Sequence, residues 1–463
     1  MIEGLQPYSE YRNSTAPWFG DVPAHWNVKR LGSVFEERGE TNELRKVTNI
    51  LSVLKDRGVI PYAEKGHIGN KASDDVGRYK IVRPDDLVVN CMNVIIGSVG
   101  RSRYTGCLSP VYYVLQRRDT KNDPRYLELV FQHKSFQQSL IRIGNGILAH
   151  RMRIPMERLK AEMFPLPPPD EQAAIVRFMD WANGRLERAI RAKRKVIALL
   201  NEQKQAIIHR AVTRGLDPNV RLKPSGVPWI GDVPAHWSLT PNRTFLRIRK
   251  VLVGFRHSEY QLLSLTKSGV VVRDMTTGGK YSNFWERSQE VRPGDLVFCF
   301  FDVEETPRTV GLSKHFGMIS GDYTVLECAD APTAAFVECF YKAMDDRKLL
   351  SPLYSGLRKR IPKPEFLAVV TPIPPRDEQV AIVRSIEESL SSIERSAERI
   401  RHEVRLLVEY RTRLVADVVT GKLDVREAEA KLPEESDDLE PLVEADEEAD
   451  DEALDTVPEE AEA

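Results

Sequence analysis

The sequence predicts an α+β protein built from two similar mixed α/β domains joined by two long helices that form an antiparallel coiled coil. Three observations predict this fold class. A nine-residue motif occurs twice, further matching segments follow each copy in the same order, and apolar residues recur at a spacing of seven after each domain. Together they indicate an internal duplication with an approximate two-fold relation between the copies.

The duplicated motif opens each half of the chain. Trp18–Trp26 reads WFGDVPAHW and Trp229–Trp237 reads WIGDVPAHW, with eight of nine positions identical at an offset of 211 residues. Matching segments follow at nearly constant offset: Gly58-Val59 with Gly269-Val270, Arg83–Val88 with Arg292–Val297, Val99-Gly100 with Val310-Gly311, Tyr112 with Tyr323, Arg153–Pro155 with Arg360–Pro362, and Asp170–Arg177 with Asp377–Arg384. A unit of about 210 residues is too long for a solenoid repeat, so the sequence predicts a duplicated domain with its connector.

Each copy begins with a turn-rich globular part. Short β-branched and aromatic runs predict strands at Asp86–Asn90, Val111–Leu115 and Leu296–Phe300. Proline clusters at Pro165–Pro169 and Pro372–Pro375 are expected to close the two domains.

A long helix is expected to follow each proline cluster, with Asp170 or Asp377 as its N-cap. One row of seam residues recurs at a strict spacing of seven, except that Lys193 interrupts it in the first helix: Met179, Leu186, Leu200 and Ile207, then Ile386, Ile393, Ile400, Leu407 and Leu414. Sustained heptads favour a coiled coil, and about 43 helical residues span roughly 65 Å. The alternative is two amphipathic helices that each pack on their own domain.

These features divide the chain into five parts. The expected parts are a first globular domain at 1–168, a first long helix at 169–214, a second globular domain at 215–375, a second long helix at 376–425 and a disordered acidic tail at 426–463.

Charge is distributed unevenly between body and tail. The net charge is −1, but residues 432–463 hold 16 Asp or Glu and no Lys or Arg, so the remaining chain carries a net +15. A basic body favours a polyanionic partner. The tail is expected either to solubilise the chain or to shield its basic surface from non-specific DNA.

Other bulk features narrow the class of protein. No apolar stretch approaches 18 residues, and the N-terminus lacks the pattern of a secretory signal. The five cysteines are scattered without CxxC spacing, so neither a disulfide framework nor a zinc site is expected. The expected location is the cytoplasm of a bacterium or archaeon.

The repeated segments resemble the specificity (S) subunits of type I restriction–modification systems. The family's typical segments are the GDVPAHW motif, the PLPPPDEQ and PIPPRDEQ segments before the helices, and the AVTRGLD and VVTGKLD segments at 211–217 and 418–424. Ser109–Tyr112 looks like the family's strand start, whereas the second copy departs to Ser320–Tyr323. The resemblance covers about residues 16–425.

This resemblance implies two target recognition domains, each reading one half of an asymmetric, bipartite site in double-stranded DNA. The helices would set the spacing and dock two methyltransferase (M) subunits, which restriction (R) subunits join. The partner subunits would use S-adenosylmethionine, ATP and Mg²⁺ to methylate adenine at N6 or to cleave DNA, and this chain is expected to bind no cofactor or metal. Methylation of a base within a duplex requires that it be flipped out.

No catalytic residue is predicted. The chain has neither an Asn/Asp-Pro-Pro-Tyr signature nor a Walker-type loop. His25 and His236 are interpreted as structural because no nucleophile accompanies them, and the Asp-Glu pairs at 170–171 and 377–378 as helix-capping groups. The alternatives are a nuclease or methyltransferase activity in this chain itself, and a coiled-coil scaffold that binds no DNA.

Candidate DNA-binding residues are Arg, Lys, Asn, His and Tyr side chains between the shared segments, since these types bind base edges and phosphates. In the first domain they are Lys55, Arg57, Lys65, His67, Asn70, Lys71, Arg101, Arg103, Asn145, His150 and Arg151. In the second they are Lys267, Arg273, Lys280, Tyr281, Arg287, Arg308, Lys314, His315, Arg358 and Lys359. The best-supported clusters directly precede the Arg-Ile-Pro segments, where a glycine turn leads into basic residues.

Overall fold

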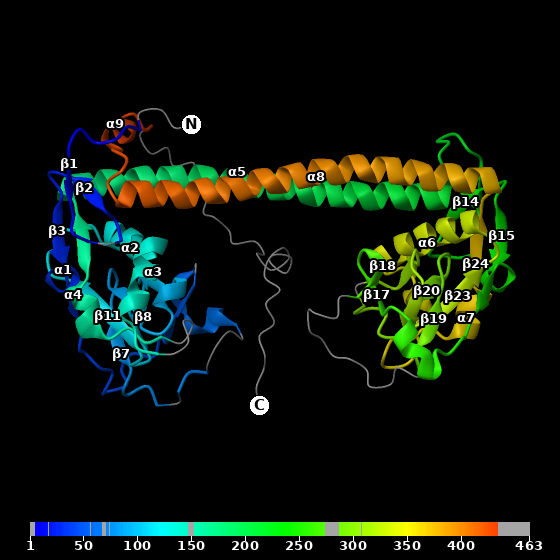
Figure 1. The fold of residues 1–463 in the computed structure, drawn as a ribbon, viewed down its shortest axis with the longest axis horizontal. Coiled ribbons are helices and arrows are strands. Elements are labelled where there is room, and N and C mark those ends of the chain that lie inside the picture. The colour runs from blue at the N-terminus through cyan, green and yellow to red at the C-terminus, as the bar shows by residue number, and fades with distance from the viewer. Residues whose placement is uncertain are drawn as a thin grey trace. The chain divides into compact units, whose positions relative to one another are not determined.

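The structure is a computed structural model that describes residues 5–16, 18–55, 57–66, 71–73, 75–146, 152–273, 287–306 and 308–433. It divides into two compact units. Unit 1 comprises residues 1–189 and 406–463, and unit 2 comprises residues 190–405. The two long helices, α5 Pro169–Arg214 and α8 Arg376–Val419, each contribute one segment to unit 1 and one segment to unit 2. Each unit therefore contains two helical segments beside its strands (Figure 1).

Unit 1 is a mixed α/β domain. Its strands are β1 Tyr11–Asn13, β2 Asp21–Pro23, β3 Asn27–Arg30, β4 Phe35–Glu37, β5 Leu51–Leu54, β6 Gly58–Pro61, β7 Lys80–Val82, β8 Leu87–Asn90, β9 Val99–Arg101, β10 Gly106–Leu108, β11 Tyr112–Arg117 and β12 Met163–Leu166. Its short helices are α1 Leu31–Val34, α2 Pro124–Gln132, α3 Lys134–Ser139 and α4 Met156–Ala161. An antiparallel sheet in the order β4-β11-β8-β9 forms the centre. Val89 and Phe131 are fully buried in the core beside it.

Unit 2 repeats this arrangement. Its strands are β13 Leu222–Pro224, β14 Asp232–Pro234, β15 Ser238–Pro241, β16 Leu246–Ile248, β17 Leu263–Thr266, β18 Gly269–Val272, β19 Gln289–Val291, β20 Leu296–Phe298, β21 Val310–Leu312, β22 Gly317–Ile319, β23 Thr324–Cys328 and β24 Val370–Ile373. Its short helices are α6 Ala331–Asp346 and α7 Lys363–Ala368. The central sheet has the order β16-β23-β20-β21, and the two-stranded pairs also correspond between the units. The predicted α+β class and internal duplication are confirmed.

The repeated glycines allow two layers to approach closely. A Cβ atom on Gly100 of β9 would lie 2.7 Å from the Cα atom of Gly58 in β6. A Cβ on Gly311 of β21 would lie 2.7 Å from Leu265 and 3.2 Å from the backbone nitrogen of Val270. Any larger side chain would therefore push the small hairpin away from the central sheet in either unit.

The proline clusters, expected to close the two domains, each begin within the last strand before a long helix. Pro165 lies within β12 and pairs with Val28, and Pro372 lies within β24 and pairs with Leu239. Both strands belong to two-stranded sheets, where proline can leave its missing donor on the unpaired edge. The clusters therefore contribute strand residues before the long helices begin.

The long helices are α5 Pro169–Arg214 and α8 Arg376–Val419, of 46 and 44 residues. Each begins one residue before its aspartate, so the prediction that Asp170 and Asp377 are N-caps is wrong. Helix α5 begins with Pro169, which fits this position because an amide hydrogen in the first turn has no helical partner. Both aspartates lie in the first turn, where their negative charge interacts favourably with the helix dipole and stabilises the helix.

Within each unit the two helical segments run antiparallel. In unit 2, the Lys193 ammonium lies 2.6 Å from Glu403, and the Lys204 ammonium lies 2.6 Å from Glu394. Of the predicted seam, Met179, Ile386 and Leu414 are buried, whereas the other six residues are half-buried. In the first helix Ile190 and Ile197, four residues behind the predicted row, are more deeply buried than Leu186 or Leu200.

The duplicated motif fastens each domain to its long helix. In unit 1, the Glu171 carboxylate accepts hydrogen bonds from the Tyr8 hydroxyl at 2.5 Å and the Trp26 indole at 2.8 Å, and contacts His25 Nε2 at 2.7 Å. In unit 2, Glu378 contacts Trp237 and His236 in the same way. The glutamate of each Asp-Glu pair thus binds the His-Trp motif, so the prediction that it caps the helix is wrong.

The C-terminal boundary also differs from the prediction. Helix α8 ends at Val419, not at 425, because Gly421 adopts a left-handed φ of +75° after it. Residues Arg426–Ala430 form helix α9, with Ala428 only 4% exposed in the core of unit 1. Residues 426–430 are therefore part of the folded unit, and the rest of the predicted tail beyond 433 lies outside the described residues.

Candidate nucleic-acid interface

In unit 1, one loop lies between two of the predicted basic segments. The loop Cys91–Ser98 joins β8 to β9. On one side, a Cβ on its Gly97 would lie 3.6 Å from the Lys55 side chain in the β5–β6 turn. On the other side, the Ile154 amide donates to the Cys91 carbonyl at 2.9 Å, at the end of the segment that begins with Asn145. The fold thus brings together residues 55, 91–98, 145 and 153–154.

In unit 2, the equivalent loop Phe300–Arg308 lies against a hairpin. The Asp302 amide of the loop donates to the Arg358 carbonyl of the hairpin at 2.9 Å, and the Ile361 amide beside the hairpin donates to the Phe300 carbonyl of the loop at 3.0 Å. The Lys359 ammonium pairs with Glu304 at 3.3 Å. Both predicted basic residues of this cluster, Arg358 and Lys359, are exposed.

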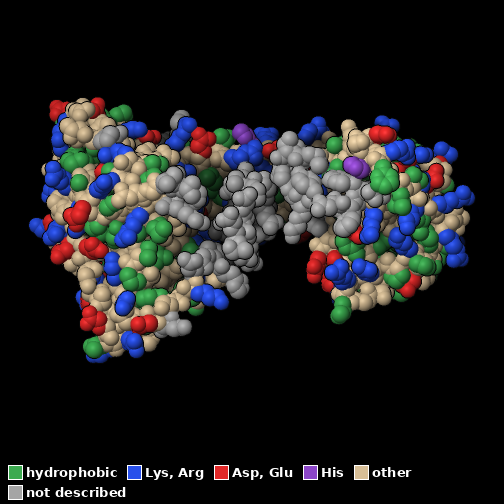
Figure 2. All heavy atoms as spheres, turned by 60° about the horizontal axis from the view of Figure 1, so that its bottom comes forward, with side chains coloured by type: hydrophobic (Ala, Val, Ile, Leu, Met, Phe, Trp, Pro, Cys, Tyr) green, Lys and Arg blue, Asp and Glu red, His purple; other side chains and the backbone are tan. Residues whose placement is uncertain are grey.

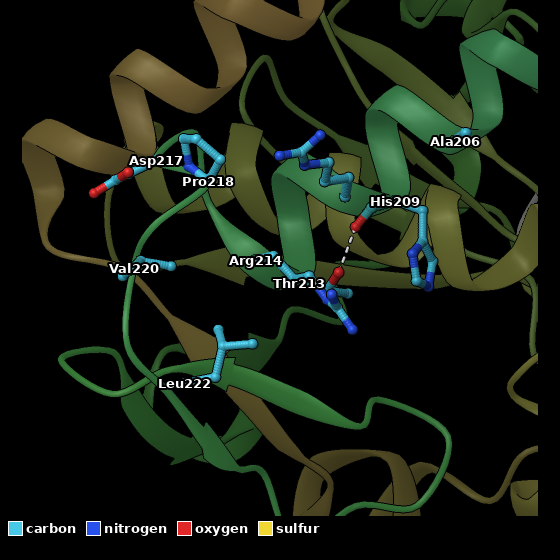
Figure 3. A pocket seen from close by; sticks show the side chains of 9 residues that line it. Ala206, His209, Thr213, Arg214, Asp217, Pro218, Val220 and Leu222 are labelled. Atoms are coloured by element: carbon cyan, nitrogen blue, oxygen red, sulfur yellow. Dashed lines mark hydrogen bonds between the residues drawn. The ribbon is translucent and has the colours of Figure 1, made fainter.

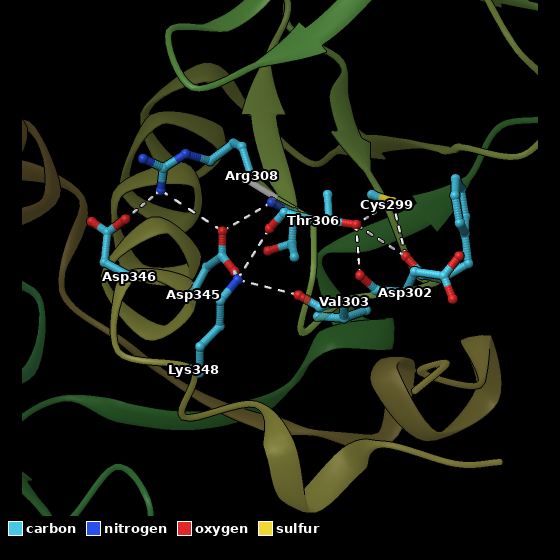
Figure 4. A network of polar contacts seen from close by, with 10 residues as sticks. Cys299, Asp302, Val303, Thr306, Arg308, Asp345, Asp346 and Lys348 are labelled. Atoms are coloured by element: carbon cyan, nitrogen blue, oxygen red, sulfur yellow. Dashed lines mark hydrogen bonds and ion pairs between the residues drawn. The ribbon is translucent and has the colours of Figure 1, made fainter. Parts of the chain in front are cut away.

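Two of the predicted arginines are bound within the protein. Arg308 is 15% exposed and pairs with Asp346 at 2.7 Å and Asp345 at 3.8 Å (Figure 4). Arg101 is 17% exposed and pairs with Asp85 at 2.8 Å and Glu128 at 3.7 Å. Their charges are neutralised at short range, so phosphate would have to compete with carboxylates already in place.

The Arg308 network fixes the loop of unit 2. Asp345 is 2% exposed and also accepts hydrogen bonds from the Thr309 amide at 2.9 Å and the Lys348 ammonium at 3.0 Å. Lys348 donates in turn to the carbonyls of Val303 and Thr306 (Figure 4). We assign Arg308 to holding this loop.

The remaining described candidates lie mostly on exposed turns. Lys65 differs, since it is 8% exposed and lies 4.9 Å from the centre of the Tyr62 ring. Arg273 is half-buried. Exposed positions are Lys55 and Arg57 in the β5–β6 turn, Lys267 in the β17–β18 turn, Arg103, Lys314 and His315 in the turns after β9 and β21, and Lys71, Asn145 and Arg287. The candidates His67, Asn70, His150, Arg151, Lys280 and Tyr281 lie outside the described residues.

Apart from Arg308, the residues of the connecting loops were not among the predicted ones. Met92 and Ile96 are 39% and 47% exposed in unit 1, and the equivalent loop of unit 2 carries Asp302, Glu304 and Glu305 instead. The sequence did contain a signal, since the offset between the copies changes from 209 at Leu87 to 211 at Val99. A length difference between otherwise matched segments marks a loop where the copies diverge.

The buried cysteines in and beside these loops do not suggest a nucleophile. Burial raises the pKa of the Cys91 thiol and of the Cys299 thiol above the ordinary value. Both thiols therefore stay protonated near neutral pH. Among the residues that the structure describes, no group of three or more His, Cys, Asp or Glu side chains could hold a metal ion.

A half-open pocket of about 470 Å³ lies elsewhere in unit 2, at the end of α5 (Figure 3). His209, Arg210, Thr213 and Arg214 line it from the helix, and Asp217 to Leu222 line it from the following segment. The Thr213 hydroxyl donates to the His209 carbonyl, and burial lowers the His209 pKa. Cationic side chains at a helix C-terminus are stabilised by the helix dipole, which accounts for these arginines.

On the face that Figure 2 draws, the described basic side chains form no single patch. On the face drawn in Figure 2, Lys and Arg side chains are interspersed with Asp and Glu over each unit. Among the described residues, no helix is long and apolar enough to cross a membrane.

The fold and the paired loops define a class of proteins in which one α+β domain with its long helix occurs twice. Residues 23–194 match the family model for the type I restriction modification DNA specificity domain. A putative type I restriction enzyme specificity subunit of Methanocaldococcus jannaschii is 22% identical over 450 residues, covering 92% of this chain and all of the relative. The chain is therefore similar to type I restriction–modification specificity subunits, over residues 23–194 for the family model and over nearly its whole length for this relative.

A solved structure from a study of complex assembly and conformational transition of the type I R-M system shares the fold, with a TM-score of 0.60 at 13% identity, and covers 86% of this chain and 98% of its own. The HsdS subunit from Thermoanaerobacter tengcongensis covers 88% of this chain and 97% of its own, with 14% identity and a TM-score of 0.47.

Proposed function

We propose that this chain is the sequence-specific DNA-binding subunit of a type I restriction–modification complex. Each domain reads one half of an asymmetric, bipartite site in double-stranded DNA. The paired helices set the distance between the halves and dock two methyltransferase subunits, which restriction subunits join. Adenine N6 methylation and ATP-dependent cleavage are carried out by these partners, which use S-adenosylmethionine, ATP and Mg²⁺, and not by this chain.

One observation carries the proposal. The two units have the same strand order, yet the loop Cys91–Ser98 of unit 1 differs from the equivalent loop of unit 2, which lies beside the hairpin Ser355–Arg360. Unit 1 has Asn93 in this loop, where unit 2 has Asp302. An amide side chain suits adenine and a carboxylate suits the amino group of cytosine. A shared fold with different chemistry at equivalent loops supports two readers of different half-sites.

The test is to express the chain with its M subunits in a host that lacks adenine methylation, and to sequence the methylated genome. The expected result is one bipartite motif with modified adenines. M subunits alone are the control and should leave no motif. The proposal is wrong if the same motif appears without this chain, or if none appears with it.

A further inference from the structure

The hairpin Ser355–Arg360 of unit 2, which carries Arg358 and Lys359, has an apolar side chain at its tip. The backbones of Ser355 and Arg360 exchange two hydrogen bonds of 2.7 and 3.0 Å. The Lys359 amide donates to the Gly356 carbonyl at 3.2 Å and closes a four-residue turn, with Leu357 and Arg358 at its centre. Leu357 has a relative exposure of 102%, the highest among the large hydrophobic side chains that the structure describes.

Contacts with the loop Phe300–Arg308 hold the turn in place. Ile361 is 2% exposed, and its amide donates to Phe300. The Asp302 amide donates to the Arg358 carbonyl, and the Lys359 ammonium pairs with Glu304. A turn fixed in this way loses little conformational entropy when it binds a partner.

The backbone of the tip is also restrained. Lys359 has a φ of +43°, which is uncommon for a residue with a side chain. Such conformations persist where the surrounding structure fixes them, and they occur often at binding sites. The strained residue directly follows the two residues at the centre of the turn.

Cationic residues surround the leucine. Arg358, Lys359 and Arg360 follow it directly, and all three are exposed. An apolar side chain flanked by phosphate-binding cations is the arrangement with which proteins insert a wedge between stacked base pairs. The corresponding segment of the first copy also places apolar residues after its glycine, as Gly146-Ile147-Leu148, of which residues 147 and 148 lie outside the described residues.

We propose that Leu357 inserts between stacked bases of the DNA bound by unit 2, while Arg358 and Lys359 contact the adjoining phosphates. This inference rests on the proposed function, since it requires that unit 2 binds DNA. Insertion removes the leucine from water and unstacks one base step, and the cations hold the distorted backbone. The simpler reading is that single exposed apolar side chains are common on protein surfaces and bind nothing.

The experiment uses the complex of this chain with its M subunits and duplexes that carry the bipartite site. The fluorescent adenine analogue 2-aminopurine replaces one base at a time across the half-site of unit 2, omitting the adenines that are methylated. Its fluorescence rises when stacking is lost. Wild type should give a several-fold rise at one step, and Leu357→Ala should abolish the rise and weaken binding about ten-fold.

Matched variants separate the wedge from general effects. Leu357→Met keeps an apolar side chain of similar volume and should keep the rise. Leu44→Ala removes an apolar side chain that is 74% exposed in unit 1 and should change nothing. Site-specific binding without a rise at any position, or with a rise that survives in Leu357→Ala, overturns the wedge alone. If the wild-type complex shows no site-specific binding at all, the proposed function is wrong as well.

Discussion

Lys193 of α5 and Glu403 of α8 form an ion pair of 2.6 Å at a heptad position where the sequence pattern calls for an apolar residue. The two side chains are 35% and 37% exposed. The Lys193 ammonium lowers the pKa of Glu403. At this exposure an ion pair contributes little to stability, so the position is one where the helix pair can be strengthened.

Replacing Lys193 with Leu should stabilise unit 2 by about 1 kcal/mol, because the apolar side chain would be removed from water in the seam. Glu403 would remain solvated and impose little cost. Hydrogen exchange of peptides from 190–205 is the measurement, and slower exchange is expected. Lys195→Leu, at an exposed position of the same helix, is the control and should not slow exchange. Equal protection in both variants would show that the seam is not the cause.

Glu171→Ala should destabilise unit 1 by about 3 kcal/mol, because the buried donors of Tyr8 and Trp26 lose their acceptor. Glu378→Ala should cost less, about 1 kcal/mol, since Glu378 is 26% exposed and solvent can replace it. Hydrogen exchange in peptides around the two His-Trp motifs distinguishes the units. Glu171→Gln retains an acceptor and should be milder. Equal losses for the two alanine variants would contradict this account.

Stability should depend on His133 below neutral pH. Burial, with a smaller contribution from Lys422, lowers the His133 pKa to about 4, and its Nδ1 accepts from the Phe136 amide. The unfolded chain binds a proton near pH 6.5 while the folded chain does not, so stability falls as the pH falls from 6.5 toward 4. The loss at pH 5 is about 2 kcal/mol.

The measurement for His133 is urea unfolding at pH 7 and pH 5. His133→Asn keeps a helix-capping acceptor but does not titrate, so its loss of stability between these pH values should be smaller by about 2 kcal/mol. Other titrating groups contribute equally to both proteins. Parallel pH curves for the two proteins would exclude this role of His133.

Replacing Arg358 and Lys359 together with Ala should weaken DNA binding by unit 2 and reduce its salt dependence. Two lost phosphate contacts make the negative slope of log K against log salt shallower by about 1.8. The measurement is a binding titration of the S–M complex at several salt concentrations. Arg384→Ala, which removes a 78% exposed arginine from α8, should leave the slope unchanged. An unchanged slope in the double variant would exclude a phosphate role.

Deleting one heptad from each helix should shorten the spacing between the half-sites. Removing 194–200 from α5 and 396–402 from α8 keeps Lys193 and Glu403 in phase. Seven residues correspond to about 10.5 Å of helix, or about three base pairs. Sequencing of the methylated genome reports the spacing directly. An active complex with the original spacing would disprove the role of the helices as a ruler.

The sequence predicted features that depend on order along the chain. Duplication could be seen because matched segments such as Arg83–Val88 and Arg292–Val297 keep their spacing. The helix pair could be predicted because side chains seven residues apart lie on one face of a helix. The predicted interval 169–214 for the first helix coincides with α5. These patterns are local, so they need no knowledge of which distant segments meet.

Partners across long separations were decided only by the tertiary structure. Trp26 and Glu171 are 145 residues apart, and nothing near Glu171 distinguishes a capping carboxylate from one that binds an indole. Arg308 and Arg358 are both basic residues between shared segments, yet Asp345 and Asp346 bind one while the other lies exposed on a hairpin. The charge of a side chain is determined by its sequence, whereas its availability to DNA depends on which carboxylates the fold places beside it.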